Sequence, residues 1–361
     1  MATVTINLPH HRYDVIIEPG ALDRLGALAR DLAPHDRCAL FVDPGVMNLY
    51  GEQVRHALHD SAYKIATHVL TGGEAAKNLD TIREGYDVLL DARLERRSPV
   101  IALGGGVTGD ATGFIAATYL RGVPFIQCPT TLLAMVDASV GGKTGVNVPQ
   151  GKNLVGAFHQ PVVVIVDPLT LQTLPPRELR CGLAECVKHA VIRDADLFEW
   201  TADNLPAIQA MQPDALVELL TRNIQIKADV VMKDEKESSV RAHLNLGHTF
   251  AHAIEATCGY GEILHGEAVS LGMLAATSLS VTRGLCDANV RTQLDSLLTR
   301  IGLPTTAALP DEATLLAAMR HDKKVADSRL RLVLPTAVGQ VTIIDDADDA
   351  QLTAAWQTVR A

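Results

Sequence analysis

Short apolar runs rich in β-branched residues alternate with segments of helical periodicity in the first half of this chain. The runs lie at residues 4–8, 13–18, 38–43, 64–70, 100–105, 125–129 and 162–167. Such apolar strands in alternation with helices are typical of a parallel sheet that helices cover on both faces. The sequence therefore predicts an α/β chain whose N-terminal part is a Rossmann-like parallel-sheet domain, with an opening strand pair.

The second half has a different pattern, because apolar residues recur there at helical spacing. The predicted helices span residues 177–193, 213–233, 247–258, 266–283, 287–301 and 311–321. One exception is the segment 329–344, which predicts two strands around a turn. The paired prolines Pro175 and Pro176 stop strands and helices alike. We therefore expect an α/β domain over 1–175 and a mainly α-helical domain over 176–361.

Composition excludes several classes of protein. The 361 residues are 47% hydrophobic, enough for a large core, and the 32 basic and 42 acidic groups give a net charge of −10. This sign is wrong for a protein that binds the nucleic-acid backbone, so an anionic partner requires a local basic pocket. The six cysteines form no C-x-x-C pair, which favours buried thiols in a reducing compartment. We find no signal peptide or membrane-spanning stretch and expect a soluble, cytoplasmic protein.

A glycine-rich turn follows one of the predicted strands, in the sequence VIALGGGVTGDATG at residues 100–113. Gly104, Gly106 and Gly109 satisfy the pattern G-x-G-x-x-G, and a helix is expected to start near Val107. Backbone N–H groups at such a helix start bind a pyrophosphate, which indicates a dinucleotide site. The alternative is that these glycines serve only the tight packing of strand against helix.

The usual dinucleotide pattern also includes an acidic residue about 20 positions later that binds the ribose. No acidic residue lies between Asp110 and Asp137, so this partner must come from elsewhere. Asp43 is the candidate, because it ends the strand at 38–43. Ligands of open α/β sheets bind beyond the carboxyl ends of the strands.

The sequence GGKTG at 141–145 resembles part of a Walker A motif, but Asp137 stands where that motif requires its first glycine. Asp137 and Lys143 flank this glycine turn, and Lys152 and Asn153 follow shortly after it. Lysines close to glycines are placed where backbone and side chain together bind an anion. A solvated loop is the alternative.

A second group of charged residues lies in the predicted helix 177–193. Lys188 and His189 follow Glu185 by three and four positions, so all three are neighbours on one helix surface. A surface salt bridge is the usual explanation of such a pair, but the flanking residues are apolar and predict a buried helix. Buried charges require an ion or a charged ligand to offset their desolvation.

Histidines cluster in the next two predicted helices. His248 and His252 lie in one, and His265 lies with Glu267 at the start of the other. Two histidines four residues apart can share one metal ion, and a helix-start histidine with a nearby carboxylate can complete the set. Spacing does not choose between the set His248, His252 and His265 and a set that includes Glu185. The lack of cysteine pairs favours an open catalytic site over a closed structural one.

These residues lie within longer motifs, and on those motifs the sequence resembles the 3-dehydroquinate synthases, members of the sugar-phosphate cyclases. The resemblance covers nearly the whole chain. It rests on GGEAAKN (72–78), ALGGGVTGD (102–110), ATYLRGVPFIQCPTTLLAMVDASVGGKTGVN (117–147), GKNLVGAFHQP (151–161), ELRCGLAECVKHA (178–190), LNLGHTFAHAIE (244–255), LHGEAV (264–269) and HDKKV (321–325). The family implies an NAD-binding α/β domain, a helical domain, an active site in the cleft between them, and a homodimer.

The resemblance also implies roles for single residues. It assigns the ligands of one divalent ion, zinc or cobalt, to Glu185, His248 and His265. Contacts to NAD are implied for Asp43, Gly72, Gly73, Glu74, Lys77, Gly105, Gly106, Val107, Thr108, Gly109, Asp110, Thr130, Thr131, Lys143, Lys152, Thr170, Leu171, Gln172 and Thr173. Contacts to substrate are implied for Asp137, Lys143, Lys152, Asn153, Lys188, Lys227, Arg241, Asn245, His252 and Lys324, with Lys323 as the alternative to Lys324. Arg121 is implied to reach across to the partner subunit.

The sequence departs from the family pattern at a few positions. Ser239 and Ser328 stand where glycine is usual, and His189 with Ala190 replaces a usual Tyr-Gly pair. None of these changes removes a group to which the resemblance assigns a catalytic role.

The implied reaction converts an acidic sugar phosphate, 3-deoxy-D-arabino-heptulosonate 7-phosphate, to 3-dehydroquinate and phosphate in the shikimate pathway. It proceeds by transient oxidation with NAD, phosphate elimination, re-reduction and intramolecular aldol closure. One alternative is another sugar-phosphate cyclase, which would have a different carboxylate pocket. A glycerol-type alcohol dehydrogenase that uses metal and NAD would not need so many cationic groups. An inactive metal-binding protein is the third alternative.

Overall fold

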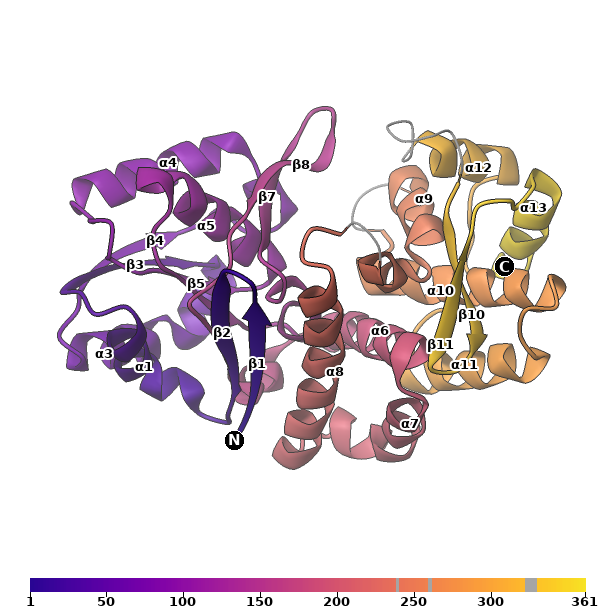
Figure 1. The fold of residues 1–361 in the computed structure, drawn as a ribbon, viewed down its shortest axis with the longest axis horizontal. Coiled ribbons are helices and arrows are strands. Elements are labelled where there is room, and N and C mark those ends of the chain that lie inside the picture. Colours follow the sequence, from indigo (N-terminus) through magenta and orange to yellow (C-terminus); the bar gives the residue numbers. More distant parts are fainter. Residues whose placement is uncertain (238–239, 259–261, 322–329) are drawn as a thin grey trace. The chain divides into compact units, whose positions relative to one another are not determined.

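The computed structural model describes residues 1–237, 240–258, 262–321 and 330–361, and Figure 1 shows its ribbon. The described chain forms two compact units. The first contains Met1–Leu174 and Met211–Met232, and the second contains Pro175–Ala210 and Lys233–Ala361. The domain limits at residues 175 and 176 stay a prediction. None of the described helices combines the length and apolarity needed to cross a lipid bilayer.

A seven-stranded sheet forms the centre of the first unit, in the spatial order β1-β2-β9-β6-β5-β3-β4. Its strands are β1 (Ala2–Leu8), β2 (His11–Ile17), β3 (Arg37–Val42), β4 (Lys64–Val69), β5 (Val100–Gly104), β6 (Phe125–Pro129) and β9 (Val163–Val166). The pair β1–β2 is antiparallel, and the other neighbours in this sheet are parallel. Every residue of β5, β6 and β9 is buried. The predicted Rossmann-like sheet and its opening strand pair are confirmed.

Helices cover both faces of this sheet (Figure 1). They are α1 (Leu25–Leu32), α3 (Glu52–Asp60), α4 (Leu79–Asp91) and α5 (Gly106–Thr118). The unit also contains the three-residue α2 (Pro44–Val46) and almost all of α8 (Pro213–Lys233). On one face, Leu25 of α1 and Leu58 of α3 pack with Leu40 of β3. On the other, Ile115 of α5 packs with Phe41 of β3. Burial of each such side chain contributes about 1.5–3 kcal/mol to the stability of the fold. The packed sheet therefore holds the carboxyl ends of its strands in fixed positions.

A β-hairpin of strands β7 (Lys143–Val148) and β8 (Gly151–Phe158) lies where the sequence predicted only a glycine turn and a loop. Most of β8 is exposed, so the segment lacks the apolar run that identified the other strands. Its pairing depends on close backbone approach: a Cβ at Gly145 would lie 2.6 Å from the carbonyl oxygen of Val155. Because glycine has a low strand propensity, a prediction based on propensity misses this hairpin.

The second unit is mainly helical, as predicted. Its elements are α6 (Pro176–Arg193), α7 (Ala195–Gln209), α9 (His248–Cys258), α10 (His265–Thr282), α11 (Ala288–Ile301), α12 (Glu312–His321) and α13 (Asp349–Gln357), with the antiparallel pair β10 (Leu332–Ala337) and β11 (Gln340–Ile344). Helix α10 is nearly all buried and packs against α6, α9, α11 and α13. Trp356 of α13 packs edge to face on Phe250 of α9, with ring centroids 5.0 Å apart. The starts of α9 and α10 are thereby held in place.

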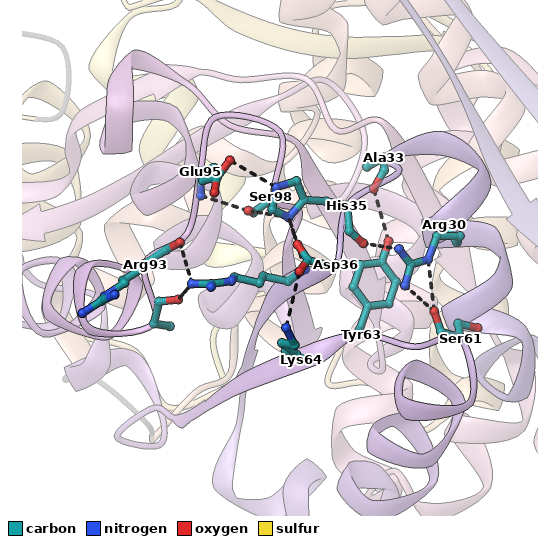
Figure 2. Close-up of polar contacts among 12 residues, drawn as sticks. Arg30, Ala33, His35, Asp36, Ser61, Tyr63, Lys64, Arg93, Glu95 and Ser98 are labelled. Atoms are coloured by element: carbon teal, nitrogen blue, oxygen red, sulfur yellow. Dashed lines mark hydrogen bonds and ion pairs between the residues drawn. The ribbon is translucent and has the colours of Figure 1, made fainter.

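A polar network joins the amino ends of the neighbouring strands β4, β3 and β5 (Figure 2). Arg30 donates from Nε to the carbonyl oxygen of Ser61 over 3.0 Å, and its guanidinium lies 4.3 Å from the ring centroid of Tyr63. The hydroxyl of Ser98 lies 3.0 Å from Nδ1 of His35. These contacts join the segments that lead into β3, β4 and β5. They lie at the sheet edge opposite the glycine turn and have a structural role.

Candidate functional site

The glycine turn lies at the carboxyl end of β5, where α5 begins. Gly105 is the N-cap of α5 and supplies no side-chain cap to the first-turn N–H groups. A Cβ at Gly105 would lie 3.3 Å from Cγ2 of Thr131, and a Cβ at Gly109 would lie 3.2 Å from Nε2 of Gln127. The glycines therefore do serve close packing, and they also leave uncapped N–H groups at a helix start. Such groups fit the pyrophosphate of a dinucleotide.

Asp43 lies beside this turn, as the sequence predicted from its place after β3. Its backbone N–H donates to the carbonyl oxygen of Leu103 over 3.2 Å. Its Oδ1 accepts hydrogen bonds from the N–H groups of Gly45 at 2.8 Å and Val46 at 3.3 Å, which caps α2. The carboxylate is thus held at the carboxyl edge of the sheet, in a position that suits a ribose hydroxyl.

Lys77 and Asp110, two predicted NAD contacts, are paired with each other. Nζ of Lys77 lies 2.5 Å from Oδ2 of Asp110, and the lysine side chain is buried. Burial raises the pKa of Asp110, and the positive charge of Lys77 opposes this shift. The pair anchors the segment Gly72–Asn78 to the first turns of α5. The predicted NAD contacts in that segment therefore lie next to those at the start of α5.

Two further predicted NAD segments follow β6 and β9. The N–H of Thr130 donates to the carbonyl oxygen of Gly104 over 2.9 Å, so Thr130 lies next to the glycine turn. Its buried Oγ1 has no hydrogen-bond partner among the residues that the structure describes. Thr170, Leu171, Gln172 and Thr173 lie in a short 3₁₀ helix after β9, where Thr173 Oγ1 and the hydroxyl of Tyr50 are 2.7 Å apart.

Asp137 and Lys227, two predicted substrate residues, are in contact. Asp137 lies in a π-helical turn, Ala134–Ala138, and Lys227 lies on α8. Nζ of Lys227 is 2.6 Å from Oδ1 of Asp137. The carboxylate offsets the desolvation cost of the buried lysine charge. The lysine can still donate a hydrogen bond to an anionic substrate.

The hairpin carries three of the predicted contact residues. Lys143 starts β7, and Lys152 and Asn153 lie near the start of β8. All three are exposed. Asn153 has a left-handed backbone with φ 57°, and its N–H donates to Oδ1 of Asn147 over 3.0 Å. No single-residue signal in the sequence indicated a role for Asn147.

Glu185, His248 and His265 form a cluster in the second unit. Glu185 lies on α6, and the two histidines are the first residues of α9 and α10. Oε1 of Glu185 is 3.8 Å from Nε2 of His248 and 3.6 Å from Nε2 of His265. One ligand atom from each residue lies within 4.8 Å of the other two. Glu185 is fully buried, whereas His252, one turn along α9 from His248, is exposed.

Two outer contacts orient these imidazoles. Nδ1 of His265 lies 3.6 Å from Oε2 of Glu255, and Nδ1 of His248 lies 3.2 Å from the carbonyl oxygen of Leu246. Both rings therefore turn Nε2 toward Glu185, as outer partners of metal-binding histidines do. Glu267, the carboxylate that the sequence places near His265, pairs instead with Arg177 through two contacts of 2.7 Å.

The electrostatics of the cluster favour a cation. Burial, with a contribution from Lys188, lowers the pKa of His248 to about 3. Burial acts in the same direction on His265, but contacts with Glu185 and Glu255 outweigh it and raise the pKa to about 10. Lys188 also forms an ion pair with Glu185. A buried carboxylate that attracts positive charge, next to two imidazole nitrogens, is a donor set that suits Zn²⁺ or Co²⁺.

The remaining predicted substrate residues of the second unit are Lys188, Arg241, Asn245 and His252. Arg241 is buried, and its Nη1 donates to the carbonyl oxygen of Glu235 over 2.6 Å. Asn245 is exposed at the end of the 3₁₀ turn Val240–Asn245. Predicted contacts at Lys323 and Lys324, and the departures at Ser239 and Ser328, fall outside the described residues.

Solved structures with this fold define the class of protein. The chain matches the 2-epi-5-epi-valiolone synthase of Streptomyces hygroscopicus subsp. jinggangensis, whose structure holds NAD⁺ and Zn²⁺, with a TM-score of 0.90, 31% identity and 98% of each chain covered. It also matches a 2-deoxy-scyllo-inosose synthase, solved with carbaglucose-6-phosphate, NAD⁺ and Co²⁺, with a TM-score of 0.89, 26% identity, and 98% and 99% of the chains covered. The chain therefore has the fold of the sugar-phosphate cyclases.

Sequence comparisons identify the family within this class. Residues 67–181 match the family model of the 3-dehydroquinate synthase N-terminal domain. Residues 182–325 match the family model of the 3-dehydroquinate synthase C-terminal domain. The 3-dehydroquinate synthase of Microcystis aeruginosa is 47% identical over 344 residues, which cover 95% of this chain and 94% of that protein. The chain belongs to the 3-dehydroquinate synthase family.

Proposed function

We propose that this protein is a 3-dehydroquinate synthase, which converts 3-deoxy-D-arabino-heptulosonate 7-phosphate to 3-dehydroquinate and phosphate. The observation that carries the proposal is the 47% identity to a 3-dehydroquinate synthase over nearly the whole of both chains. The cluster of Glu185, His248 and His265 supports it, because the reaction needs a divalent ion in addition to NAD.

The two cofactors would be held by different units. Glu185, His248 and His265 would bind the divalent ion. The N–H groups at the start of α5 would bind the pyrophosphate of NAD, and Asp43 would bind its adenosine ribose. When bound, the ion would polarise the alcohol that is oxidised, and NAD would accept and return its hydride. We propose residues 1–175 as the NAD domain and 176–361 as the metal and substrate domain.

Cationic side chains explain how a protein with a net charge of −10 holds an acidic sugar phosphate. Lys143, Lys152, Lys227 and Arg241 would bind the carboxylate and the phosphate through charge-assisted hydrogen bonds. His252 would move a proton at the ring-opening step, because an imidazole nitrogen can both accept and donate a proton.

We also propose that the protein is a cytoplasmic homodimer. Arg121 lies in a tight turn after α5, with a left-handed φ of 69° and an exposed side chain. This exposure would let its guanidinium reach the site of the partner subunit. A test is the oligomeric state in solution, together with activity from a mixture of Arg121→Ala and Lys152→Ala subunits, which a contribution across the interface would restore in part.

A different sugar-phosphate cyclase activity is the second candidate. The TM-score of 0.90 to a valiolone synthase favours it. The fold and a metal-binding set of side chains would be compatible with either reaction. The two activities differ in whether the substrate carries a carboxylate. Such a group would need its own cationic partners, of which Arg241 and Lys152 are the candidates.

The test compares two substrates. Purified protein with NAD and Zn²⁺ or Co²⁺ receives either the heptulosonate phosphate or a heptulose phosphate without the carboxylate, and released phosphate is measured. We expect turnover of the first only. Lys152→Ala and Arg241→Ala should each lower kcat/KM by tenfold to hundredfold or more, since a hydrogen bond to a charged group contributes about 1.5–3 kcal/mol. Lys64→Ala, at an exposed lysine near the opposite sheet edge, is the matched control and should change little.

A further inference from the structure

Asn147 near the end of β7 makes three hydrogen bonds to two separate segments. Its N–H donates to the carbonyl oxygen of Lys77 over 2.8 Å. Its Nδ2 donates to Oε1 of Glu74 over 2.7 Å, and its Oδ1 accepts from the N–H of Asn153 over 3.0 Å. The register of the β7–β8 pair shifts between Val146 and Val148, so Asn147 lies at an irregularity of the hairpin. Its backbone N–H is thereby available to Lys77 instead of the neighbouring strand.

The two segments that Asn147 joins have different proposed tasks. The segment Gly72–Asn78 carries proposed NAD contacts and is anchored to α5 through Lys77 and Asp110. The hairpin carries Asn153, proposed for the substrate, and Lys152, for which the resemblance implies contacts to both NAD and substrate. All of these residues belong to the first unit.

The amide side chain is well suited to this place. The contact with Glu74 requires a donor, and the contact with Asn153 requires an acceptor at the same distance from the backbone. Aspartate supplies only acceptors, and alanine supplies neither. The bond to Asn153 also helps to hold a non-glycine residue in the left-handed region, which costs free energy.

We propose that Asn147 is a positioning residue that couples NAD binding to the placement of Lys152 and Asn153. When NAD orders the segment Gly72–Asn78, the hydrogen bonds of Asn147 order the start of β8 with it. The substrate lysine is then in place only when the cofactor is bound. This inference rests on the proposed function, because it assumes that the segment binds NAD.

The test uses Asn147→Asp, which keeps the acceptor for Asn153 and places a carboxylate oxygen against the carboxylate of Glu74. Backbone amide exchange of residues 147–158 is measured without NAD and at saturating NAD. In the unaltered protein we expect NAD to slow exchange by about fivefold or more, the lower end of ordinary coupling between sites. In Asn147→Asp the effect should fall below about twofold.

A second variant separates coupling from simple damage. Asn147→Asp combined with Glu74→Gln reverses the polarity of one hydrogen bond and keeps the net charge. Because Glu74 is itself a proposed NAD contact, the NAD concentration is first raised until it saturates this variant, and the protection by NAD should then return. Thr144→Val removes another hydrogen bond of the hairpin, from Thr144 Oγ1 to the carbonyl oxygen of Ala157 at 2.8 Å, and should leave the NAD effect intact. For substrate turnover we expect Asn147→Asp to raise KM about tenfold with a smaller change in kcat.

Several results would overturn the inference. They are equal NAD protection in Asn147→Asp and the unaltered protein, no protection in the unaltered protein, or loss of protection in Thr144→Val. Failure of the proposed function is distinguishable, because it would show as NAD-dependent protection of the hairpin without any release of phosphate from the heptulosonate phosphate.

Discussion

Nζ of Lys227 lies 2.6 Å from Oδ1 of Asp137, although 90 residues separate them in the sequence. Lys227 also donates to the carbonyl oxygen of Asp137. The lysine is 5% exposed, so these contacts fix the turn of Asp137 on α8. The pair thus joins two residues that the resemblance assigned to the substrate.

Replacement of this lysine should lower stability as well as activity. Lys227→Met removes both contacts, and we expect the free energy of unfolding to fall by about 1–3 kcal/mol, since the partly buried carboxylate of Asp137 loses a charged partner. Urea unfolding measures the change. Lys64→Met is the control, because the Lys64–Asp36 pair is exposed and 3.6 Å apart and should contribute less than about 1 kcal/mol. Equal losses in the two variants would contradict this account of Lys227.

We expect metal binding to depend on only one of the two histidines of α9. His248 faces Glu185, whereas His252 is one turn away and exposed. His248→Ala should lose the divalent ion, and His252→Ala should keep about one ion per chain, as expected when only one of the two is a ligand. Metal analysis of the purified variants decides the assignment. Metal loss in His252→Ala with retention in His248→Ala would show that the cluster is assigned wrongly.

Because of the carboxylate of Asp43, we expect the protein to bind NAD more tightly than NADP. A carboxylate at this place accepts a hydrogen bond from a free 2′-hydroxyl and repels a 2′-phosphate. Asp43→Asn retains the cap of α2, because the amide oxygen accepts from the same N–H groups. We expect the variant to bind NAD about tenfold more weakly and to discriminate less between the cofactors. Titration with both cofactors tests this, and tighter binding of NADP by the unaltered protein would exclude the role of Asp43.

Because Tyr63 is buried, we expect the folded protein to lose stability at alkaline pH. Burial raises the pKa of Tyr63 to about 12 from the usual value of 10.0. Its contribution to stability is present below pH 10, where the tyrosine is neutral in both states, and is lost as the pH rises toward 12. Tyr63→Phe loses the 3.2 Å hydrogen bond to the carbonyl oxygen of Ala33, which costs about 1 kcal/mol at neutral pH. Urea unfolding should show the difference between the two proteins narrowing near pH 11, and a constant difference would contradict the shifted pKa.

Much of the fold could be predicted because long periodic segments carry their own signal. Helix α10 and the buried strands were expected close to their observed limits. Among the described helices of the second unit, two were not expected: α7 contains Pro206, which normally ends a helix, and α13 is short and carries only one large apolar residue before Trp356. The hairpin β7–β8 was missed because its glycines and exposed face give no apolar run.

The site was only partly visible in the sequence. Spacing placed His248 and His252 on one helix but did not decide which of them faces Glu185, since that depends on how α9 packs against α6. The contact of Glu255 with His265 depends on the packing of α9 against α10. The contacts of Asn147 arise from a hairpin that was not expected, and a lone asparagine in a glycine-rich segment gives no signal of its own.

The central claim is that NAD acts catalytically in a phosphate-eliminating reaction. Its most direct test is to follow released phosphate and free NADH together while purified protein, one divalent ion and NAD act on the heptulosonate phosphate. If the hydride returns to the same substrate molecule, phosphate should appear in step with substrate consumption while NADH absorbance stays near baseline. Steady accumulation of NADH without phosphate release would contradict the claim and support a simple alcohol dehydrogenase.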